Sequence, residues 1–231
     1  MNSLDGAISQ FVNGPAQHWP AFDQAVVFLS NSDLVKGGVV VGAIWAAWFL
    51  VKGDQETNRS ALLAAIVGSL FALFLARVLA FCAPLRVRPL LNPALGLRPP
   101  TGLPAESNWT SWSSFPSDHA ALFIALACGV WWVSRRGGWA LLGYIVVAIF
   151  LPRLYIGIHY TSDLLAGGVL GATVVALFAS EMVRTTLFVP VVRWGDRHPA
   201  IFSFALFVLL FQIATLFWDV RVAISLCGFS T

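Results

Sequence analysis

Charged side chains are scarce in this sequence: Asp, Glu, Lys and Arg together make up 11% of its 231 residues. Soluble chains carry about 25% on average. Hydrophobic residues make up 58%, and the mean hydropathy is +0.78. One water-soluble core of this size cannot hide so many apolar side chains, so we expect the lipid bilayer to be the solvent for much of the chain.

The sequence also lacks clustered basic charge and paired cysteines. The formal net charge of +3 is too small and too scattered for nucleic-acid binding, and it fits a protein that faces anionic headgroups or an anionic substrate. The three cysteines, Cys82, Cys128 and Cys227, are odd in number and show no C-x-x-C spacing, which argues against a disulfide framework or a zinc site. We expect them to be buried small hydrophobes.

Six apolar runs approach the roughly twenty residues that a membrane helix needs. They are residues 35–51, 60–83, 118–133, 139–158, 163–182 and 200–218. Residues 5–30 alternate polar and apolar groups too often to span, which predicts an interfacial helix. We therefore predict an all-α, polytopic membrane protein with a single domain over residues 1–231. It has a bundle of six transmembrane helices and an N-terminal interfacial helix.

The connections between these runs place most of the polar residues on one membrane face. The third and fourth runs are joined by only a few residues, so we expect an antiparallel pair. The start of the third run then shares a face with the end of the fourth, with the loop 84–117 and with the start of the fifth. The polar residues gathered there are Arg86, Arg88, Arg98, Ser117, Asp118, His119, Arg153, His159 and Asp163.

Two arginines indicate which way the chain crosses the membrane. Arg135 and Arg136 lie in the very short connection after the third run, where the positive-inside rule applies most directly. Candidate aromatic belts are Trp131, Trp132 and Trp139 on the inner side, and Trp19, Trp109, Trp112 and Trp218 on the outer side. We predict a protein integral to the inner (cytoplasmic) membrane, with its active site on the outer, periplasmic face.

Arginines, histidines and a carboxylate on one face are the groups needed to cleave a phosphate ester without a metal. Cations must hold the phosphate oxygens, a nucleophile must attack in line, and an acid must protonate the leaving oxygen. Arginine binds phosphate with a planar fork and keeps its charge. Histidine titrates near neutrality, and a carboxylate behind it fixes its tautomer.

Two segments supply these groups. Asp163 follows His159 by four residues, so in a helix the two share one face and can hydrogen-bond. The alternative is that Arg153 snorkels and His159 caps an interface. The segment before His119 predicts a turn into a helix, capped by Ser117 or Asp118, whose free N–H groups form an anion site. The alternative there is a simple capping box.

These residues resemble the signature of the type 2 phosphatidic acid phosphatases, the PAP2 superfamily. That signature has a basic residue followed by Arg-Pro, then Pro-Ser-Gly-His, then Ser-Arg with His and Asp at fixed intervals. The matching positions are Arg88-Pro89, Pro116-Ser117-Asp118-His119, and Arg153, His159 and Asp163. The layout of helices and loops is similar over most of the chain.

The resemblance implies a role for each matched residue. His159 forms a phosphohistidine intermediate, Asp163 orients it, and His119 protonates the leaving oxygen and later activates water. The residues that would hold the phosphate are Arg88, Arg153 and Ser117, with neighbouring amides at Asp118. The resemblance implies neither metal nor cofactor. The implied partners are a lipid phosphate substrate and the bilayer, and the oligomeric state is not specified.

Three positions depart from the family signature. Phe81 stands where the family has a lysine; Arg77 or Arg86 could replace its charge, and we favour Arg86 as a phosphate ligand. Pro152 replaces the serine before the arginine of the third part. Asp118 replaces glycine, as it also does in the branch acting on undecaprenyl diphosphate, which favours a polyprenyl diphosphate substrate.

Three functions are consistent with these residues. The first is a metal-independent phosphatase that hydrolyses a lipid monophosphate or diphosphate, either undecaprenyl diphosphate or a glycerophospholipid phosphate. The second is a lipid-to-lipid phosphotransferase with the same site. The third is a protein that binds or transports lipid phosphates without chemistry. The sequence alone does not separate the three.

Overall fold

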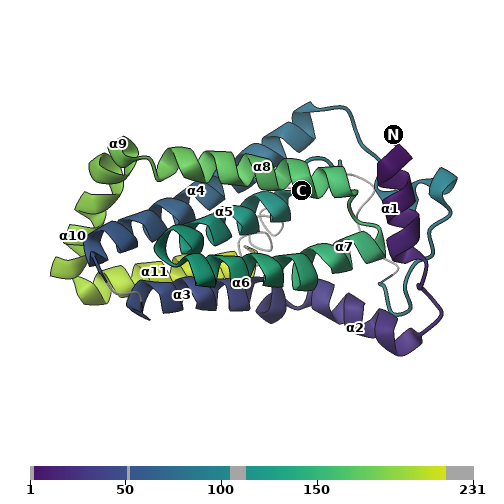
Figure 1. Ribbon diagram of the computed structural model, residues 1–231, viewed down its shortest axis with the longest axis horizontal. Coiled ribbons are helices and arrows are strands. Elements are labelled where there is room, and N and C mark those ends of the chain that lie inside the picture. The colour runs from purple at the N-terminus through teal and green to yellow at the C-terminus, as the bar shows by residue number, and fades with distance from the viewer. Residues whose placement is uncertain (1–2, 51–52, 105–112, 217–231) are drawn as a thin grey trace, which may run out of the picture.

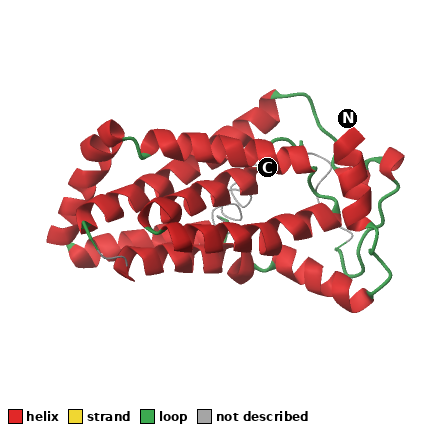
Figure 2. Ribbon diagram, viewed as in Figure 1, coloured by secondary structure: helices red, strands yellow, loops and turns green. Residues whose placement is uncertain are grey.

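The computed structural model describes residues 3–50, 53–104 and 113–216, and all of these are helical or connecting segments (Figure 2). The all-α prediction is confirmed for this part of the chain. The helices are α1 (Ser3–Asn13), α2 (Pro20–Asn31), η1 (Leu34–Gly38), α3 (Val39–Leu50), α4 (Gln55–Cys82), α5 (Asp118–Val133), α6 (Arg135–Ile145), η4 (Val146–Phe150), α7 (Leu151–Ile156), α8 (Thr161–Phe178), α9 (Glu181–Val183), η5 (Arg184–Phe188), α10 (Val189–Arg197) and α11 (Pro199–Ala214). Two short 3₁₀ turns, η2 (Pro89–Leu91) and η3 (Pro93–Leu95), lie in the loop between α4 and α5.

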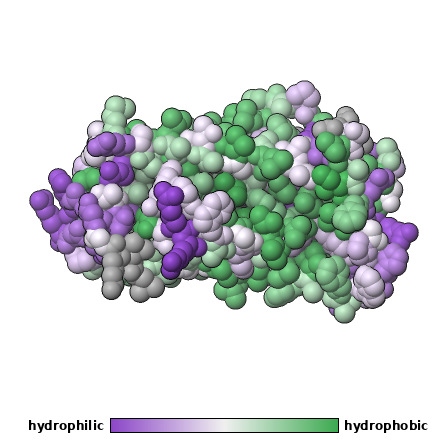
Figure 3. Space-filling view, in the orientation of Figure 1, coloured by the Kyte–Doolittle hydropathy of each residue, from purple (hydrophilic) through white to green (hydrophobic). Residues whose placement is uncertain are grey.

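The long helices run along the long axis of the molecule, and α1 stands across one end (Figure 1). At the centre, α5 packs against α4, α6 and α8. Fully buried apolar side chains of α5, such as Leu122, Phe123 and Leu126, form the main core with Ile66 of α4 and Ile145 of α6. Apolar side chains also cover the middle of the face shown in Figure 3, while hydrophilic ones gather toward the two ends, as expected for a membrane protein.

The count of six spans is not confirmed. Within the part of the chain that the structure describes, three helical segments are long and apolar enough to cross a membrane: Gln55–Cys82, Arg135–Ile156 and Thr161–Phe178. The pair α2 and η1–α3, bent by 60°, is a fourth candidate. Helices α5 and α11 have 16 residues each. Such a helix is only about 24 Å long, against about 30 Å of hydrocarbon.

The N-terminal segment differs from the single interfacial helix predicted over residues 5–30. It forms two helices, because Gly14 and Pro15 follow the end of α1 and Pro20 starts α2. Helix α2 packs on α7 and continues, through the 60° bend, into η1 and α3. The first predicted span, 35–51, is therefore the second limb of a longer bent segment.

Residues 181–197 form α9, η5 and α10 at the end of the bundle opposite α1 (Figure 1), although no helix is predicted between residue 182, where the fifth predicted span ends, and residue 200. Polar pairs with α4 hold this segment: Arg193 bonds Glu56 at 2.7 Å, and Arg59 bonds Asp196 at 3.1 Å. The segment is too polar for a hydropathy search to find.

Some predicted features lie at the edges of the described residues or beyond them. Cys82 is exposed at the end of α4, so it is not the buried hydrophobe predicted, and Cys128 is half-buried. The residues outside the described part of the chain include Trp109, Trp112, Trp218, Cys227 and the end of the sixth predicted span.

Glycines let α5 and α8 approach closely. A Cβ atom on Gly167 would lie 2.2 Å from the carbonyl oxygen of Ser117, and one on Gly171 would lie 2.1 Å from that of Ala121. Small residues four apart are a common device for close packing of membrane helices. This contact fixes the start of α5, which carries His119, against the start of α8.

We expect Gly171→Ala to destabilise the protein, because the added Cβ would force α5 and α8 apart at a cost of about 1–3 kcal/mol. The midpoint of thermal unfolding in detergent should fall. Gly168→Ala is the matched control, since its Cβ would meet only a side-chain carbon of Ile124 at 3.5 Å. Equal midpoints for the two variants would contradict the close packing.

Candidate active site

Backbone hydrogen bonds tie together the loops at the end of the bundle near α1. Ser114 N donates to Arg86 O at 2.9 Å, and Ser117 N donates to Asp163 O at 3.1 Å. Leu90 N donates to Gly157 O at 2.9 Å, where Gly157 has φ +79° and leaves no room for a Cβ. These bonds therefore hold the loop before α5 against the loop before α8. The antiparallel pairing of the third and fourth apolar runs predicted that the two loops lie at the same end of the bundle.

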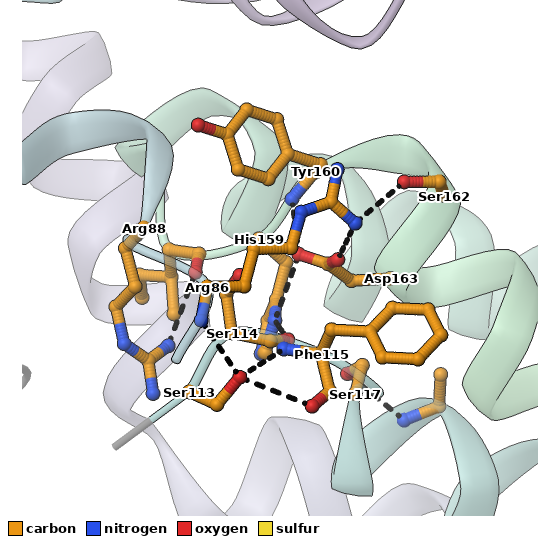
Figure 4. A network of polar contacts seen from close by, with 12 residues as sticks. Arg86, Arg88, Ser113, Ser114, Phe115, Ser117, His159, Tyr160, Ser162 and Asp163 are labelled. Carbon is orange, nitrogen blue, oxygen red and sulfur yellow. Dashed lines mark hydrogen bonds and ion pairs between the residues drawn. The ribbon is translucent and has the colours of Figure 1, made fainter. Parts of the chain in front are cut away.

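The imidazole of His159 is buried at the centre of this arrangement (Figure 4). Its Nδ1 atom lies 2.9 Å from the carbonyl oxygen of Ser114 and 3.8 Å from the carboxylate of Asp163. The predicted pairing of His159 with Asp163 is thus present as an ion-pair contact at 3.8 Å, but it does not lie within a helix, because α8 starts only at Thr161 and His159 precedes it. Asp163 instead accepts a hydrogen bond from Tyr160 N at 2.8 Å, in a capping box.

The Ser114 contact selects one tautomer of His159. A carbonyl oxygen can only accept, so Nδ1 carries the hydrogen and the lone pair is on Nε2. Burial lowers the pKa of His159 below its ordinary value of 6.5, and the nearby charges of Arg88 and Arg153 lower it further, against the effect of Asp163. The ring is therefore neutral at pH 7, with Nε2 available as a nucleophile.

Arg86 joins Asp163 to the N-terminal helix. Its guanidinium donates to Asp163 at 2.5 Å and to Ser162 Oγ at 2.9 Å, and lies 4.4 Å from the ring centroid of Tyr160 (Figure 4). It also donates to Asp5 at 2.7 Å. Asp5 also accepts from Ser162 N at 3.0 Å. This arginine, predicted to bind phosphate in place of the missing lysine, is thus shared by two carboxylates.

Arg88 and Arg153 supply positive charge beside the imidazole. Arg88 donates to the carbonyl oxygen of Ile158 at 3.0 Å, and burial lowers its pKa while Asp118 and Asp163 raise it. Arg153 is 6% exposed, and its Nε atom is buried without a hydrogen-bond partner. A buried guanidinium of this kind is costly unless an anion accompanies it.

The second histidine, His119, lies in the first turn of α5. Its Nδ1 atom contacts the carboxylate of Asp118 at 2.7 Å, and the other oxygen of Asp118 accepts from Arg77 at 3.1 Å. Asp118 interacts electrostatically with both imidazoles. The structure thus places the carboxylate of Asp118 against His119 and Arg77, whereas the predicted contact with phosphate is one of its backbone amide.

The amides at the start of α5 are largely occupied. Ser117 is fully buried and caps the helix, with its Oγ 3.4 Å from Ala120 N. His119 N donates to Asp118 Oδ1 at 2.7 Å, and Ser117 N is bonded to Asp163 as described above. The start of α5 therefore has fewer free N–H groups for binding an anion than the sequence predicted. The guanidinium groups of Arg88 and Arg153 provide most of the positive charge.

Within the described residues, no group of three or more His, Cys, Asp and Glu side chains is arranged to hold a metal ion. The charges gathered around the imidazoles are those of arginines and aspartates. An arginine fork binds phosphate and carboxylate groups bidentately, so these arginines suit an anion of that kind.

The sequence interpretation missed Asp5, Ser114 and Ser162. A signal for Asp5 was present, because Asp5, Ser9 and Asn13 recur every four residues and all three are buried on one face of α1. A polar stripe on the buried side of a short helix indicates a contact with polar groups. Ser114 contacts His159 through its backbone carbonyl, which every type of residue carries, so its side chain gives no signal in the sequence.

Comparisons with known proteins agree with these observations. The model of the PAP2 superfamily matches residues 61–187. The "Bacitracin transport permease protein BcrC" of Bacillus licheniformis is 36% identical over 59 residues, which span 26% of this chain and only 29% of that protein. The "Undecaprenyl-diphosphatase BcrC" of Bacillus subtilis (strain 168) is 26% identical over 172 residues, 74% of this chain and 77% of that protein. No solved structure matches.

The tautomer and protonation of His159 can be tested by NMR of ¹⁵N-histidine-labelled protein in detergent, with His159→Gln used to assign the signal. We expect Nδ1 to carry the hydrogen, and the ring to stay neutral until the pH falls below the ordinary histidine range, because burial disfavours the charged form. A ring protonated on Nε2 at neutral pH would contradict this geometry.

Proposed function

The chain belongs to the PAP2 superfamily, and we propose that it is a membrane phosphatase that hydrolyses a lipid phosphate through a phosphohistidine intermediate, with the whole of residues 1–231 as one catalytic domain. A polyprenyl diphosphate is the favoured substrate. The name of the B. subtilis relative, an undecaprenyl-diphosphatase, supports that choice, as does Asp118 in the second part of the signature. A glycerophospholipid phosphate is the alternative lipid.

The observation that carries this proposal is the buried Arg153 with its unpartnered Nε atom, next to a second arginine, Arg88. Two like charges in a buried site repel each other and lose hydration. A phosphate group with two negative charges would compensate the charges of both arginines and accept a hydrogen bond from the Nε atom of Arg153. In our proposal these two arginines, with the hydroxyl of Ser117, hold the phosphate oxygens.

His159 is the proposed nucleophile. The lone pair of Nε2 attacks phosphorus, and the bond to the leaving oxygen breaks. The ring then carries a positive charge, which the carbonyl oxygen of Ser114 at 2.9 Å and the carboxylate of Asp163 at 3.8 Å stabilise. Arg86 holds Asp163 in place and is a positioning residue in this account, since its fork is bonded to Asp163 and Asp5.

His119 is the proposed acid and base. Its protonated ring gives the proton on Nε2 to the leaving oxygen, while Asp118 stabilises the imidazolium through Nδ1. A water molecule then gives a proton to His119 and attacks the phosphohistidine. The bond between phosphorus and Nε2 of His159 breaks, which releases inorganic phosphate. Asp118 is thus a positioning residue, and neither step requires a metal or a cofactor.

We propose the inner membrane as the location and its outer, periplasmic face for the site. The connection with Arg135 and Arg136 lies at the end of α5 away from His119, consistent with a cytoplasmic position under the positive-inside rule. In addition, α10 places Arg193 and Arg197 at the same end of the bundle as that connection (Figure 1).

Replacement of the nucleophile should abolish phosphate release. We expect His159→Ala to lower kcat by about 10⁴-fold or more on undecaprenyl diphosphate or phosphatidylglycerol phosphate, as when a covalent nucleophile is removed elsewhere. His18→Ala is the control, because His18 is exposed and its ring lies against two neighbouring backbone oxygens and Trp19, away from the site residues. Wild-type activity of purified His159→Ala would rule out the mechanism.

Arg153→Lys should retain charge but lose the planar fork. We expect kcat to fall about 10²–10³-fold, the usual effect of losing one donor to a developing charge. Phosphate release by the wild type should persist in excess EDTA, because in this account arginines, and not a metal ion, compensate the negative charge of the phosphate. Full activity of the lysine variant, or complete inhibition by the chelator, would count against these assignments.

A further inference from the structure

Helix α1 turns a polar side toward the protein. Asp5, Ser9 and Asn13 are buried on one face of this helix, while Leu4 and Phe11 are exposed. A helix that packs on a protein core usually buries its apolar face instead. Because α1 packs on α7 and α8, its polar side faces the end of the bundle that carries the candidate active site (Figure 1).

The carboxylate of Asp5 lies at the N-terminus of α8. Ser162 N donates to its Oδ1 at 3.0 Å, and Ser162 Oγ donates to its Oδ2 at 2.5 Å. Arg86 also donates to Oδ2, at 2.7 Å. Burial raises the pKa of Asp5, but the hydrogen bonds from Ser162 and Arg86 and the charge of Arg86 lower it more strongly. Asp5 is therefore ionised at pH 7, and its charge lies at the positive end of the α8 dipole.

The carboxylate of Asp163 uses its two oxygens for different contacts. Its Oδ1 accepts from Nη1 of Arg86 at 2.5 Å. Its Oδ2 accepts from Tyr160 N at 2.8 Å, and this is the oxygen that lies 3.8 Å from Nδ1 of His159. The proposed nucleophile thus faces the oxygen that is not bonded to the arginine.

Arg86 is divided between the two carboxylates. Its Nη2 bonds Asp5 and its Nη1 bonds Asp163. An arginine fork beside a single carboxylate tends to bind both oxygens at once. Without the charge of Asp5, we expect Nη2 to turn to Asp163 and to compete with His159 for Oδ2. The two carboxylates and one guanidinium also leave one excess negative charge, which a positively charged imidazole beside them would compensate.

We propose that Asp5 is a positioning residue of the active site, which holds one side of the Arg86 fork and thereby keeps Oδ2 of Asp163 turned toward His159. This inference rests on the proposed function. Asp5 lies outside residues 61–187, which match the model of the PAP2 superfamily, so the family likeness does not assign this role. The alternative is that Asp5 only fastens α1 to the bundle.

The second half of α1 has polar ties of its own. Asn13 Nδ2 donates to the carbonyl oxygen of Tyr155 at 2.9 Å, and Gln10 Nε2 donates to that of Leu95 at 3.0 Å. A substitution at Asp5 leaves both of these bonds in place. The positioning role can therefore be tested separately from the docking of the helix.

Kinetics of Asp5→Asn give the first test. We expect kcat on undecaprenyl diphosphate to fall about 10- to 100-fold, the effect that a small misplacement of a catalytic group can have. KM should stay unchanged, as when an interaction made only in the transition state is lost. Gln10→Ala removes a tie of the same helix and should retain kcat. An unchanged kcat in Asp5→Asn, or an equal loss in Gln10→Ala, would overturn the proposal.

The ring of His159 gives a second readout, which a purely structural Asp5 would not change. The charged groups that act on this ring are Arg88, Arg153, Asp118 and Asp163. If Arg86 binds both oxygens of Asp163 in Asp5→Asn, the carboxylate stabilises the imidazolium less. ¹⁵N NMR in detergent should then show the ring taking up its proton at a lower pH than in the wild type. Identical titrations in folded protein would contradict the positioning role.

A double variant shows whether Asp5 acts through Arg86. We expect Asp5→Asn with Arg86→Met to have the same kcat as Arg86→Met alone, because residues that act as one unit are not additive. The double variant leaves no unpaired guanidinium, so it tests the proposal even if Asp5→Asn alone does not fold. A further loss of kcat in the double variant would overturn it.

The outcomes separate this inference from the function on which it rests. If the wild type releases no phosphate from any lipid phosphate, the proposed function fails, while the NMR titration still shows whether Asp5 influences His159. If the wild type releases phosphate but Asp5→Asn changes neither kcat nor the titration, the function stands and the positioning role fails.

Discussion

Arg153 lies near the end of an apolar helical segment and is 6% exposed, and among the described residues no group bonds its Nε atom. Desolvation of a charge costs several kcal/mol unless a partner compensates it. Arg88 adds a like charge nearby, and the oxygens of Asp118 are already bonded to Arg77 and His119. In our proposal this site is organised around the phosphate of the substrate, which supplies the negative charge that the described residues around Arg153 lack.

The fold maintains this strained charge arrangement through close backbone contacts. Gly167 and Gly171 bring α5 and α8 together, so that the two histidine-bearing segments are set by main-chain packing. Pro152, which cannot donate a backbone hydrogen bond, follows a π-helical turn at η4 that interrupts the regular helix one turn before Arg153. The N-terminal helix then closes the network, because Asp5 shares Arg86 with Asp163.

Loop lengths and hydropathy were enough to predict an all-helical membrane protein whose polar residues meet at one end. Of the two predicted candidates for the cap of α5, Ser117 and Asp118, it is Ser117 that caps the helix. Loop lengths and hydropathy did not predict the partners of the polar residues. His159 bonds Ser114, 45 residues away, and Ser162 bonds Asp5, 157 residues away. Such pairings depend on tertiary distances that no local pattern encodes. The helix α10 was missed because its sequence is polar on average, although Val192 is buried in the main core and exposed ion pairs link the helix to α4.

Direct trapping of the intermediate tests the central claim, that the neutral ring of His159 attacks phosphorus through Nε2. Purified protein would be mixed with ³²P-labelled lipid diphosphate, quenched in alkali within milliseconds and digested, and the labelled peptide sequenced by mass spectrometry. The account predicts phosphate bound to Nε2 of residue 159, stable in alkali and labile in acid. Phosphate on another residue, or release of product with no labelled protein at any time point, would contradict it.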